Sequence, residues 1–159
     1  REATDSTLQQ RPLFKTSSGR TVYGGGGIIP DYHIPTKENL SESTIKIITH
    51  PDRLIFNFSS LLKKKINGSF NNYDHFYKSF YIDQNDKKSF INSIEEKNIE
   101  IILKEVNSDW IYIENRIKSE IASSLWGKEF LFKTNLKMDD QVLESYNYFN
   151  EAIKLLKDN

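Results

Sequence analysis

Cysteine is absent from this sequence of 159 residues, and methionine occurs only once. Without cysteine, the chain can form no disulfide, no thiolate nucleophile and no cysteine-ligated zinc or iron-sulfur centre. No apolar run reaches the roughly 18 consecutive residues that a membrane-spanning helix needs. Neither sign of charge is in excess, since 22 basic residues balance 22 acidic ones. Net charge therefore gives no reason to expect nucleic acid, an acidic membrane or a charged substrate as a partner.

The sequence begins at Arg1, without an initiator methionine and without an apolar leader. We therefore expect it to be a piece of a longer polypeptide, with any targeting signal upstream. Its length suits one domain, or one domain with a substantial tail.

Glycine is also scarce, with seven residues in all, yet four of them form the run Gly24 to Gly27. Before this run, residues 13–23 hold two β-prone stretches around a Ser-Ser-Gly turn, which predicts a β-hairpin with Gly19 at positive φ. Residues 28–34 are expected to be extended, because Pro30 and Pro35 keep the residues before them out of the α region. Residues 1–10 are polar and aperiodic and are expected to be a loop or a frayed end.

Helical patterning starts near residue 37, where glycine almost disappears and apolar residues recur at a spacing of three or four. We therefore divide the chain into a β segment, 1–36, and a helical domain, 37–159. Caps and apolar spacing predict helices over 41–49, 52–66, 72–81, 83–97, 108–126 and 139–157. The predicted fold class is mainly α, a bundle of about five helices preceded by a short β segment.

The residues expected in the core share helical spacing within each predicted helix. They are Leu54, Phe58, Leu61, Leu62 and Ile66; Tyr73, Phe76, Tyr77 and Phe80; Phe90, Ile91 and Ile94; Trp110, Ile113, Ile117, Ile121 and Leu125; and Val142, Tyr146, Phe149, Ile153 and Leu156. Trp126, Phe130 and Phe132 are also expected to be buried rather than to form an aromatic surface for a partner.

The glycine run itself carries no side-chain chemistry. A phosphate-binding P-loop requires Lys and then Ser or Thr after the last glycine, whereas Ile28, Ile29, Pro30 and Asp31 follow here. The dinucleotide fingerprint also fails, because no helix opens at these glycines. We interpret the run as a structural connection between strands, where glycine allows backbone conformations closed to other residues.

The whole string from Phe14 to Asp31, F-K-T-S-S-G-R-T-V-Y-G-G-G-G-I-I-P-D, resembles the segment T-x-x-G-R-x-V-Y-x-G-G-G-I-x-P-D. That segment is typical of C-terminal processing peptidases of the S41 type (tail-specific serine proteases), especially their Bacteroidetes-like members. Residues 116–127, R-I-K-S-E-I-A-S-S-L-W-G, resemble the helix end L-K-A-x-I-A-x-x-L-W-G in the C-terminal extension of the same subgroup. Between about residues 40 and 105 the similarity extends only to helical character and length.

The resemblance implies a parent hydrolase of the periplasm or cell envelope, in which a PDZ domain inserts near a mixed α/β protease core. The family's Ser nucleophile and Lys general base precede the glycine-rich segment, so no catalytic residue is assigned to this chain, which should be inactive alone. No metal and no cofactor is assigned to the chain. The positions that match the family's motifs are given a structural role. They are Gly19, Arg20, Tyr23, Gly24, Gly25, Gly26, Gly27, Pro30, Asp31, Leu125, Trp126 and Gly127.

A second Ser/Lys dyad within the chain was considered, because Ser43 to Lys46 and Ser60 to Lys63 both read S-x-x-K. This spacing places Ser and Lys one helical turn apart in penicillin-binding enzymes. Chance predicts as many such strings from the numbers of serines and lysines, and the companion motifs S-D-N and K-T-G are missing. We interpret both strings as solvated helix faces.

The histidines, His33, His50 and His75, lack the i, i+4 spacing that would put two ligands on one helix face. A zinc site would need tertiary proximity that the sequence does not predict. The basic run Lys63 to Lys65 lies at an expected helix C-terminus, where the macrodipole favours cations, and is interpreted as a complement to that dipole.

Two hypotheses of function follow. In the first, the chain is a non-catalytic C-terminal portion of a serine peptidase, and it packs on the core or PDZ domain, organises oligomers, or presents protein or peptide substrates. In the second, it is an independent helical protein-interaction module unrelated to proteolysis, and the glycine run is a flexible linker. Neither hypothesis involves nucleic acid.

Overall fold

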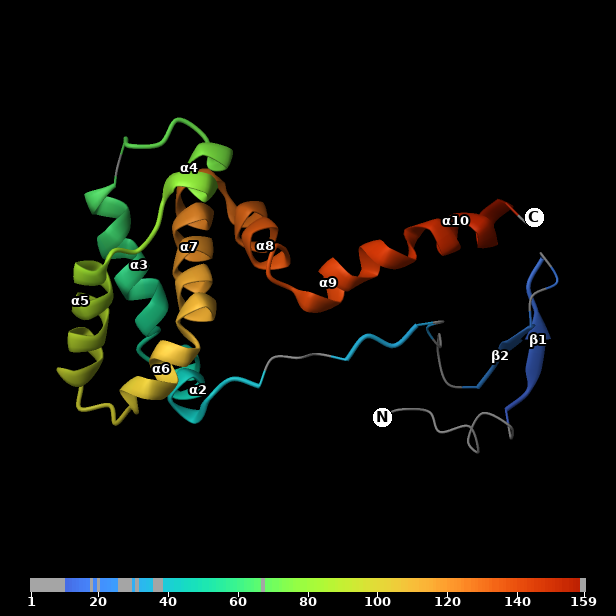
Figure 1. Ribbon diagram of the computed structural model, residues 1–159, viewed down its shortest axis with the longest axis horizontal. Coiled ribbons are helices and arrows are strands. Elements are labelled where there is room, and N and C mark those ends of the chain that lie inside the picture. The colour runs from blue at the N-terminus through green and yellow to red at the C-terminus, as the bar shows by residue number, and fades with distance from the viewer. Residues whose placement is uncertain are drawn as a thin grey trace. The chain divides into compact units, whose positions relative to one another are not determined.

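A computed structural model describes residues 11–17, 19, 21–25, 30, 32–35, 39–66 and 68–157. The chain divides into two compact units, one comprising Lys37–Leu143 and the other Arg1–Thr36 together with Glu144–Asn159. We call them the helical unit and the terminal unit. The protein is mainly helical with a short antiparallel sheet of two strands, which confirms the predicted fold class (Figure 1).

The helical unit is built from short and medium helices around one long helix, α7. In chain order they are α2 (Glu42–Thr49), α3 (Leu54–Lys65), α4 (Tyr73–Ser79), α5 (Gln84–Glu95), α6 (Leu103–Ser108), α7 (Trp110–Trp126) and α8 (Lys128–Leu136). Helix α7 packs most extensively against α3 and α8, and α2 packs against α3 and α6 (Figure 1). This arrangement buries the apolar stripe of α7 from several sides.

The core of the helical unit consists of apolar side chains from every one of these helices except α8. The largest fully buried ones are Ile47, Phe76, Phe90, Ile94, Val106, Ile113, Ile117 and Ile121. Aromatic rings extend this core at one end, where Phe76 packs against Phe80 and Trp126 at centroid distances of 5.0 and 5.3 Å. The helical unit therefore has a core of its own.

The terminal unit contains the predicted hairpin. Strands β1 (Leu13–Lys15) and β2 (Thr21–Tyr23) pair antiparallel with Leu13 opposite Tyr23. The turn between them contains Gly19 at φ 79°, as predicted, and its N–H donates to the Thr16 carbonyl at 2.9 Å. Leu13, Phe14 and Tyr23 are 61, 58 and 42 % exposed. The large apolar side chains of the hairpin are therefore not packed into a core.

The C-terminal part consists of α9 (Asp140–Ser145), the 3₁₀ turn η1 (Tyr146–Tyr148) and α10 (Phe149–Lys157), where a single helix was predicted. Tyr32 lies against this part of the chain. Its ring stacks on that of Tyr148 at 4.1 Å, and its hydroxyl donates to the Glu151 carboxylate. Tyr32 and the C-terminal helix thus contact each other within the terminal unit.

Several expectations about burial were wrong. Leu61 and Phe132 are 61 and 54 % exposed, because their positions lie outside the faces that α3 and α8 turn to the core. Ile55, on the buried side of α3, takes a core place that the sequence pattern did not predict. Tyr146, Phe149 and Ile153 are 59, 53 and 46 % exposed, so the apolar face of the last helix is not covered.

Two helices were missed for identifiable reasons. Helix α6 has six residues, and Ile102 at its N-cap makes no side-chain cap hydrogen bond, so the sequence offers neither length nor a cap as a signal. Gly127 was predicted to end α7, which it does at φ 115°, but it is also the N-cap of α8. Among the described residues, no helix is long and apolar enough to cross a membrane.

Candidate functional site

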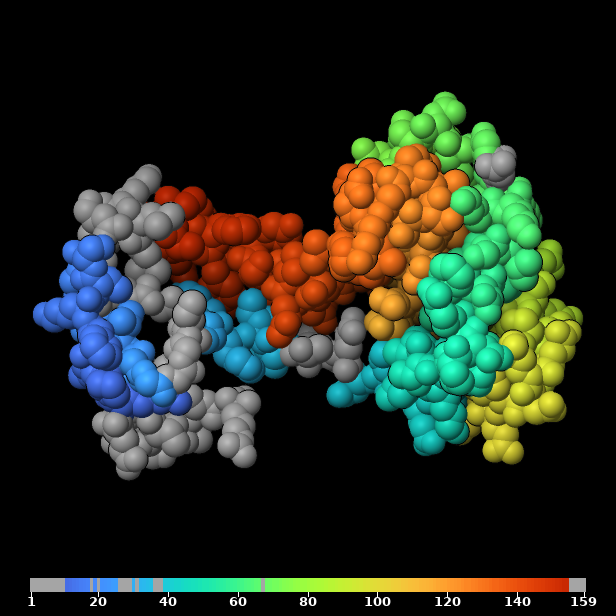
Figure 2. All heavy atoms as spheres, turned by 180° about the vertical axis from the view of Figure 1, so that it is seen from behind, coloured from blue at the N-terminus to red at the C-terminus, as the bar shows by residue number. Residues whose placement is uncertain are grey.

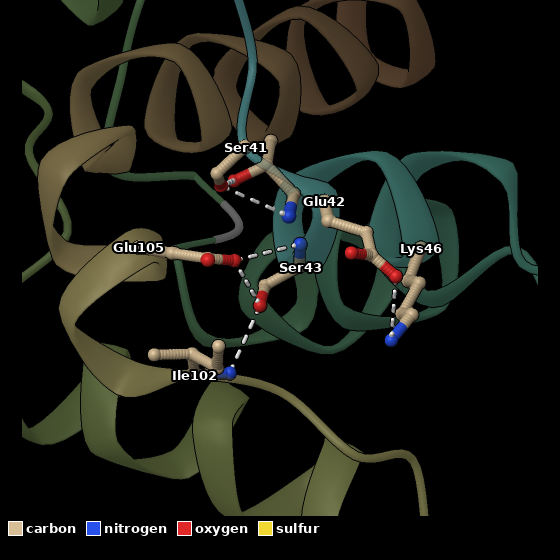
Figure 3. A network of polar contacts seen from close by, with 7 residues as sticks. Ser41, Glu42, Ser43, Lys46, Ile102 and Glu105 are labelled. Atoms are coloured by element: carbon tan, nitrogen blue, oxygen red, sulfur yellow. Dashed lines mark hydrogen bonds and ion pairs between the residues drawn. The ribbon is translucent and has the colours of Figure 1, made fainter.

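The densest polar cluster lies where the chain enters the helical unit, at the N-terminus of α2 (Figure 3). Ser41 is the N-cap of α2, and its N–H and hydroxyl both donate to Asp109 Oδ2, at 2.9 and 2.6 Å. Two residues further along, the N–H and hydroxyl of Ser43 both donate to Glu105 Oε2, at 3.0 and 2.6 Å. We call these four residues the carboxylate clamp.

The clamp also reaches the start of α6. The main-chain N–H of Ile102 donates to Ser43 Oγ at 2.9 Å, so this hydroxyl both donates and accepts (Figure 3). Beside it, Glu42 and Lys46 form an exposed ion pair at 3.3 Å within α2. Asp109 is the N-cap residue of α7 but makes no side-chain cap hydrogen bond, and its carboxylate accepts from Ser41 instead. The clamp thus ties α2 to α6 and to the junction of α6 and α7.

Electrostatics favour this arrangement. The free N–H groups and positive end of the helix dipole at the α2 N-terminus attract anions, and both carboxylates lie there. The hydrogen bond from the Ser43 hydroxyl lowers the pKa of Glu105, and that from the Ser41 hydroxyl lowers the pKa of Asp109. The serine hydroxyls donate to ionised carboxylates, and no hydrogen bond joins either hydroxyl to an imidazole or amine of the described residues that could act as a base. The arrangement fits a structural clamp rather than a nucleophile.

Acid is expected to weaken the clamp. A carboxyl whose pKa is lowered in the folded state stabilises that state above its unfolded pKa, near 4, and loses this contribution as pH falls through the folded pKa. Urea unfolding from about pH 6 down to about pH 3 should therefore show falling stability in the wild type. In the double variant Glu105→Gln/Asp109→Asn the decline should be shallower. If stability fell equally with pH in the wild type and the double variant, the role of Glu105 and Asp109 in the clamp would be contradicted.

The two S-x-x-K strings do not form dyads, although all four of their side chains are described. Ser43 belongs to the clamp and Lys46 pairs with Glu42. Ser60 donates to the Phe56 carbonyl of its own helix at 3.0 Å. The structure instead brings Lys63 to Ser124 on α7, where the ammonium donates to the Ser124 carbonyl at 3.0 Å and to its hydroxyl at 2.7 Å.

This unpredicted Lys63–Ser124 contact borders a surface hollow of about 520 Å³ lined by Ser60, Lys63, Lys64 and Ser124. A serine nucleophile would need N–H groups directed at a developing oxyanion. Ser124 lies in the last turns of α7, where helix geometry presents carbonyls, and one of them is bound by Lys63. The contact therefore acts as a C-terminal cap that joins α3 to α7.

The other lysines of the basic run have separate surroundings. Lys65 forms an ion pair with Asp86 on α5 at 2.8 Å, and the hydrogen bond that its ammonium donates to the Asp86 carboxylate raises the pKa of Lys65. All three lysines lie in the last turn of α3, which agrees with a role as complement to its dipole.

The histidines do not come together in a metal site. His50 Nδ1 accepts from the Asp52 N–H at 3.2 Å, and the His75 ring packs near Phe70 at 5.4 Å. Within the described residues, no group of three or more His, Asp or Glu side chains is placed to hold a metal ion.

The family-motif residues of the first segment lie in and after the hairpin. The Gly24 N–H donates to the Pro12 carbonyl at 2.8 Å, and a side chain at Gly24 would meet the Phe14 ring at 2.4 Å, which explains glycine there. Gly25 has φ 83°. Arg20, Gly26, Gly27 and Asp31 lie outside the described residues, and Pro30 is exposed. These contacts fit a structural role for the segment.

The second motif lies at the end of α7. Trp126 packs against Tyr73 and Phe76 at 6.1 and 5.3 Å, and Leu125 is partly buried against the core. Gly127, at φ 115°, lets the chain turn into α8. Leu125, Trp126 and Gly127 thus connect α7, α4 and α8, and no described contact gives them a chemical role.

A model of a protein family of unknown function (DUF8443) matches residues 52–127. The match begins before α3 and ends at Gly127, so it covers the part of the core formed by α3 to α7. No curated protein and no solved structure matches the chain.

Proposed function

We propose that the chain is a non-catalytic portion of a C-terminal processing serine peptidase, and that its helical unit positions or binds proteins for the protease core. The parent would be a hydrolase of the periplasm or cell envelope, with the upstream core and PDZ domain as partners and peptides or proteins as substrates. The proposal combines the resemblance of residues 14–31 and 116–127 with the geometry of the hairpin.

The main support for the proposal is the β1–β2 hairpin, which has no further strand beside it among the described residues. Each strand has three residues, and within the described part of the chain each pairs only with the other. An isolated hairpin of two strands is marginally stable at best in water, and further strands or a packed helix are needed to stabilise it. Leu13, Phe14 and Tyr23 leave large apolar surfaces exposed. These features are expected of strands that complete a larger sheet.

The helical unit supports a non-catalytic role. Its polar clusters have structural explanations, since the clamp fixes α2 and the Lys63–Ser124 contact caps α7. It also has a core of its own, so it can serve as an accessory domain beside the sheet.

Peptidase assays test the proposal. The purified chain should hydrolyse no unstructured peptide or denatured protein above the level of buffer, whereas the complete gene product should. Ser124→Ala in the purified chain is the matched control, because it removes the serine hydroxyl that accepts from the Lys63 ammonium. Hydrolysis by the chain that disappears in Ser124→Ala would overturn the non-catalytic assignment.

The alternative, an independent helical interaction module, is favoured by one observation, the self-contained core of the helical unit. It predicts that the complete gene product has no peptidase activity. It also predicts that a fragment of residues 37–143 is as stable as the same unit in the whole chain and binds the same partner protein.

A further inference from the structure

The surface hollow beside the Lys63–Ser124 contact has a polar lining from two helices. Among the described residues it is lined by Ser60, Lys63 and Lys64 of α3 and by Ser124 of α7. Helix α3 packs along α7, and its teal and green surface borders the orange surface of residues near the end of α7 on the face shown in Figure 2. The volume of about 520 Å³ falls within the range of about 300–1,000 Å³ that is typical of small-molecule sites.

The charge of this hollow is positive. Two of its lining residues are lysines, and none of those described is acidic. The third lysine of the run, Lys65, points elsewhere, since its ammonium is engaged by Asp86 on α5. Lys64 makes no ion pair with any described residue. The two lining ammonium groups are therefore not neutralised by a carboxylate of the lining.

Hydrogen-bond donors also remain available there. An ammonium group has three N–H bonds, and Lys63 uses two of them on the carbonyl and the hydroxyl oxygen of Ser124. The Ser124 hydroxyl accepts from Lys63, and its own proton makes no hydrogen bond to the described residues. Lys64 keeps all of its donors. Ser60 is not counted, because its hydroxyl donates to the Phe56 carbonyl. The hollow thus offers three donor groups, of which two are charged.

Two local features oppose an anion. The C-terminal turns of α3 and α7 each carry the negative end of a helix dipole, equivalent to about half an elementary charge. The Lys63 ammonium already covers one of the α7 carbonyls, which reduces that effect. Glu120 lies four residues before Ser124, on the neighbouring turn of α7, and is not part of the lining. The two ammonium charges outweigh the dipoles, so an exposed site of modest affinity is expected.

We propose that this hollow binds the phosphate group of a small polar molecule. A phosphate monoester carries a charge of about −1.5 to −2 and three strong acceptor oxygens, which match two ammonium groups and three donor groups. Lysine binds phosphate as a point charge, so the site needs no bidentate geometry. A carboxylate has half that charge and one acceptor oxygen fewer. The inference concerns the helical unit alone and does not depend on the proposed function.

A nuclear magnetic resonance titration of the whole chain tests the site. Inorganic phosphate and glucose 6-phosphate are added separately at about pH 7.5, where phosphate is mainly the dianion. Both should give saturable shifts of the amides of residues 60–64 and 123–125. Acetate and glucose are the matched comparators at equal ionic strength, and acetate should bind at least threefold more weakly than phosphate. Added sodium chloride should weaken phosphate binding, because the charges are exposed and screened.

Variants assign the binding to the named groups. Lys64→Met keeps the length of the side chain without its charge and should weaken phosphate binding about fivefold. Lys88→Met removes an exposed lysine of α5 outside the hollow and is the matched control, with no change expected. Ser124→Ala should weaken binding about threefold, because one donor is lost. Glu120→Gln should tighten binding about twofold, because a nearby negative charge is removed.

Three results would overturn the inference. Shifts that do not saturate, or that spread over the whole chain, would show that phosphate has no site here. Equal weakening by Lys64→Met and Lys88→Met would reduce the effect to net charge. Acetate that binds as tightly as phosphate would make the hollow a general anion site and would contradict the assignment to phosphate. Peptidase activity of the complete gene product has no bearing on any of these outcomes.

Discussion

Replacing Phe90 by alanine is expected to lower the free energy of unfolding of the helical unit by about 3–5 kcal/mol, the cost of emptying a phenylalanine site in a packed core. The ring is fully buried and packs against Phe58 and Trp110 at centroid distances of 5.0 and 6.1 Å. Domains of this size are stable by about 5–15 kcal/mol, so the variant should be close to unfolding at room temperature.

Urea unfolding followed by circular dichroism measures this change through the midpoint and slope. Phe132→Ala is the matched control, because it deletes the same ring from a site that is 54 % exposed and should change stability by less than about 1 kcal/mol. Equal losses in the two variants would contradict the assignment of the core.

Replacing Ser43 by alanine should give the second large effect. The variant removes the hydroxyl that donates to Glu105 and accepts from the Ile102 N–H, at a residue that is 2 % exposed. An intramolecular hydrogen bond contributes about 0.5–1.5 kcal/mol net, and the Ser43 hydroxyl makes two of them. Amide exchange in α2 should accelerate together with the loss of global stability.

Ser60→Ala is the control for this substitution. The Ser60 hydroxyl is exposed and donates only to the carbonyl of Phe56 in its own helix. Its loss should change stability by less than about 0.5 kcal/mol. An equally small loss of stability in Ser43→Ala would contradict the stabilising role of the clamp.

The sequence predicted the helical elements best where two signals agreed. In α7, apolar spacing from Trp110 to Leu125 coincided with a glycine at the end, and the helix was found with its stripe inward. In α4 and α5, Asn72 and Asp83 form side-chain caps, and the aromatic or apolar residues behind them are buried. Helices α6 and α8 escaped prediction, because one lacks a side-chain cap and the other begins at a glycine that already ends α7.

The carboxylate clamp could not be predicted, because Ser43 and Glu105 are 62 residues apart. Sequence patterns predict contacts between neighbours along a helix or strand, not between residues that are far apart in the chain. The serine at position 41 did carry a signal, since it precedes the helix as an N-cap. Lys63 and Ser124 likewise meet only through the packing of α3 on α7.

The exposed face of α10 was missed for a related reason. Apolar spacing shows that a helix has an apolar face, but it does not show which part of the protein packs against that face. The sequence was interpreted as one helical domain from residue 37 to 159, and this domain boundary stays a prediction; the compact helical unit of the structure is Lys37–Leu143. The assignment of the β segment to a protease core also stays a prediction.

Peptide hydrolysis by the complete gene product, measured beside the present chain at equal concentration, tests the central claim most directly. The account predicts hydrolysis by the complete protein that survives Ser43→Ala and Ser124→Ala, and none by the chain alone. Absence of hydrolysis by the complete protein, or its loss on either substitution without unfolding, would contradict the account.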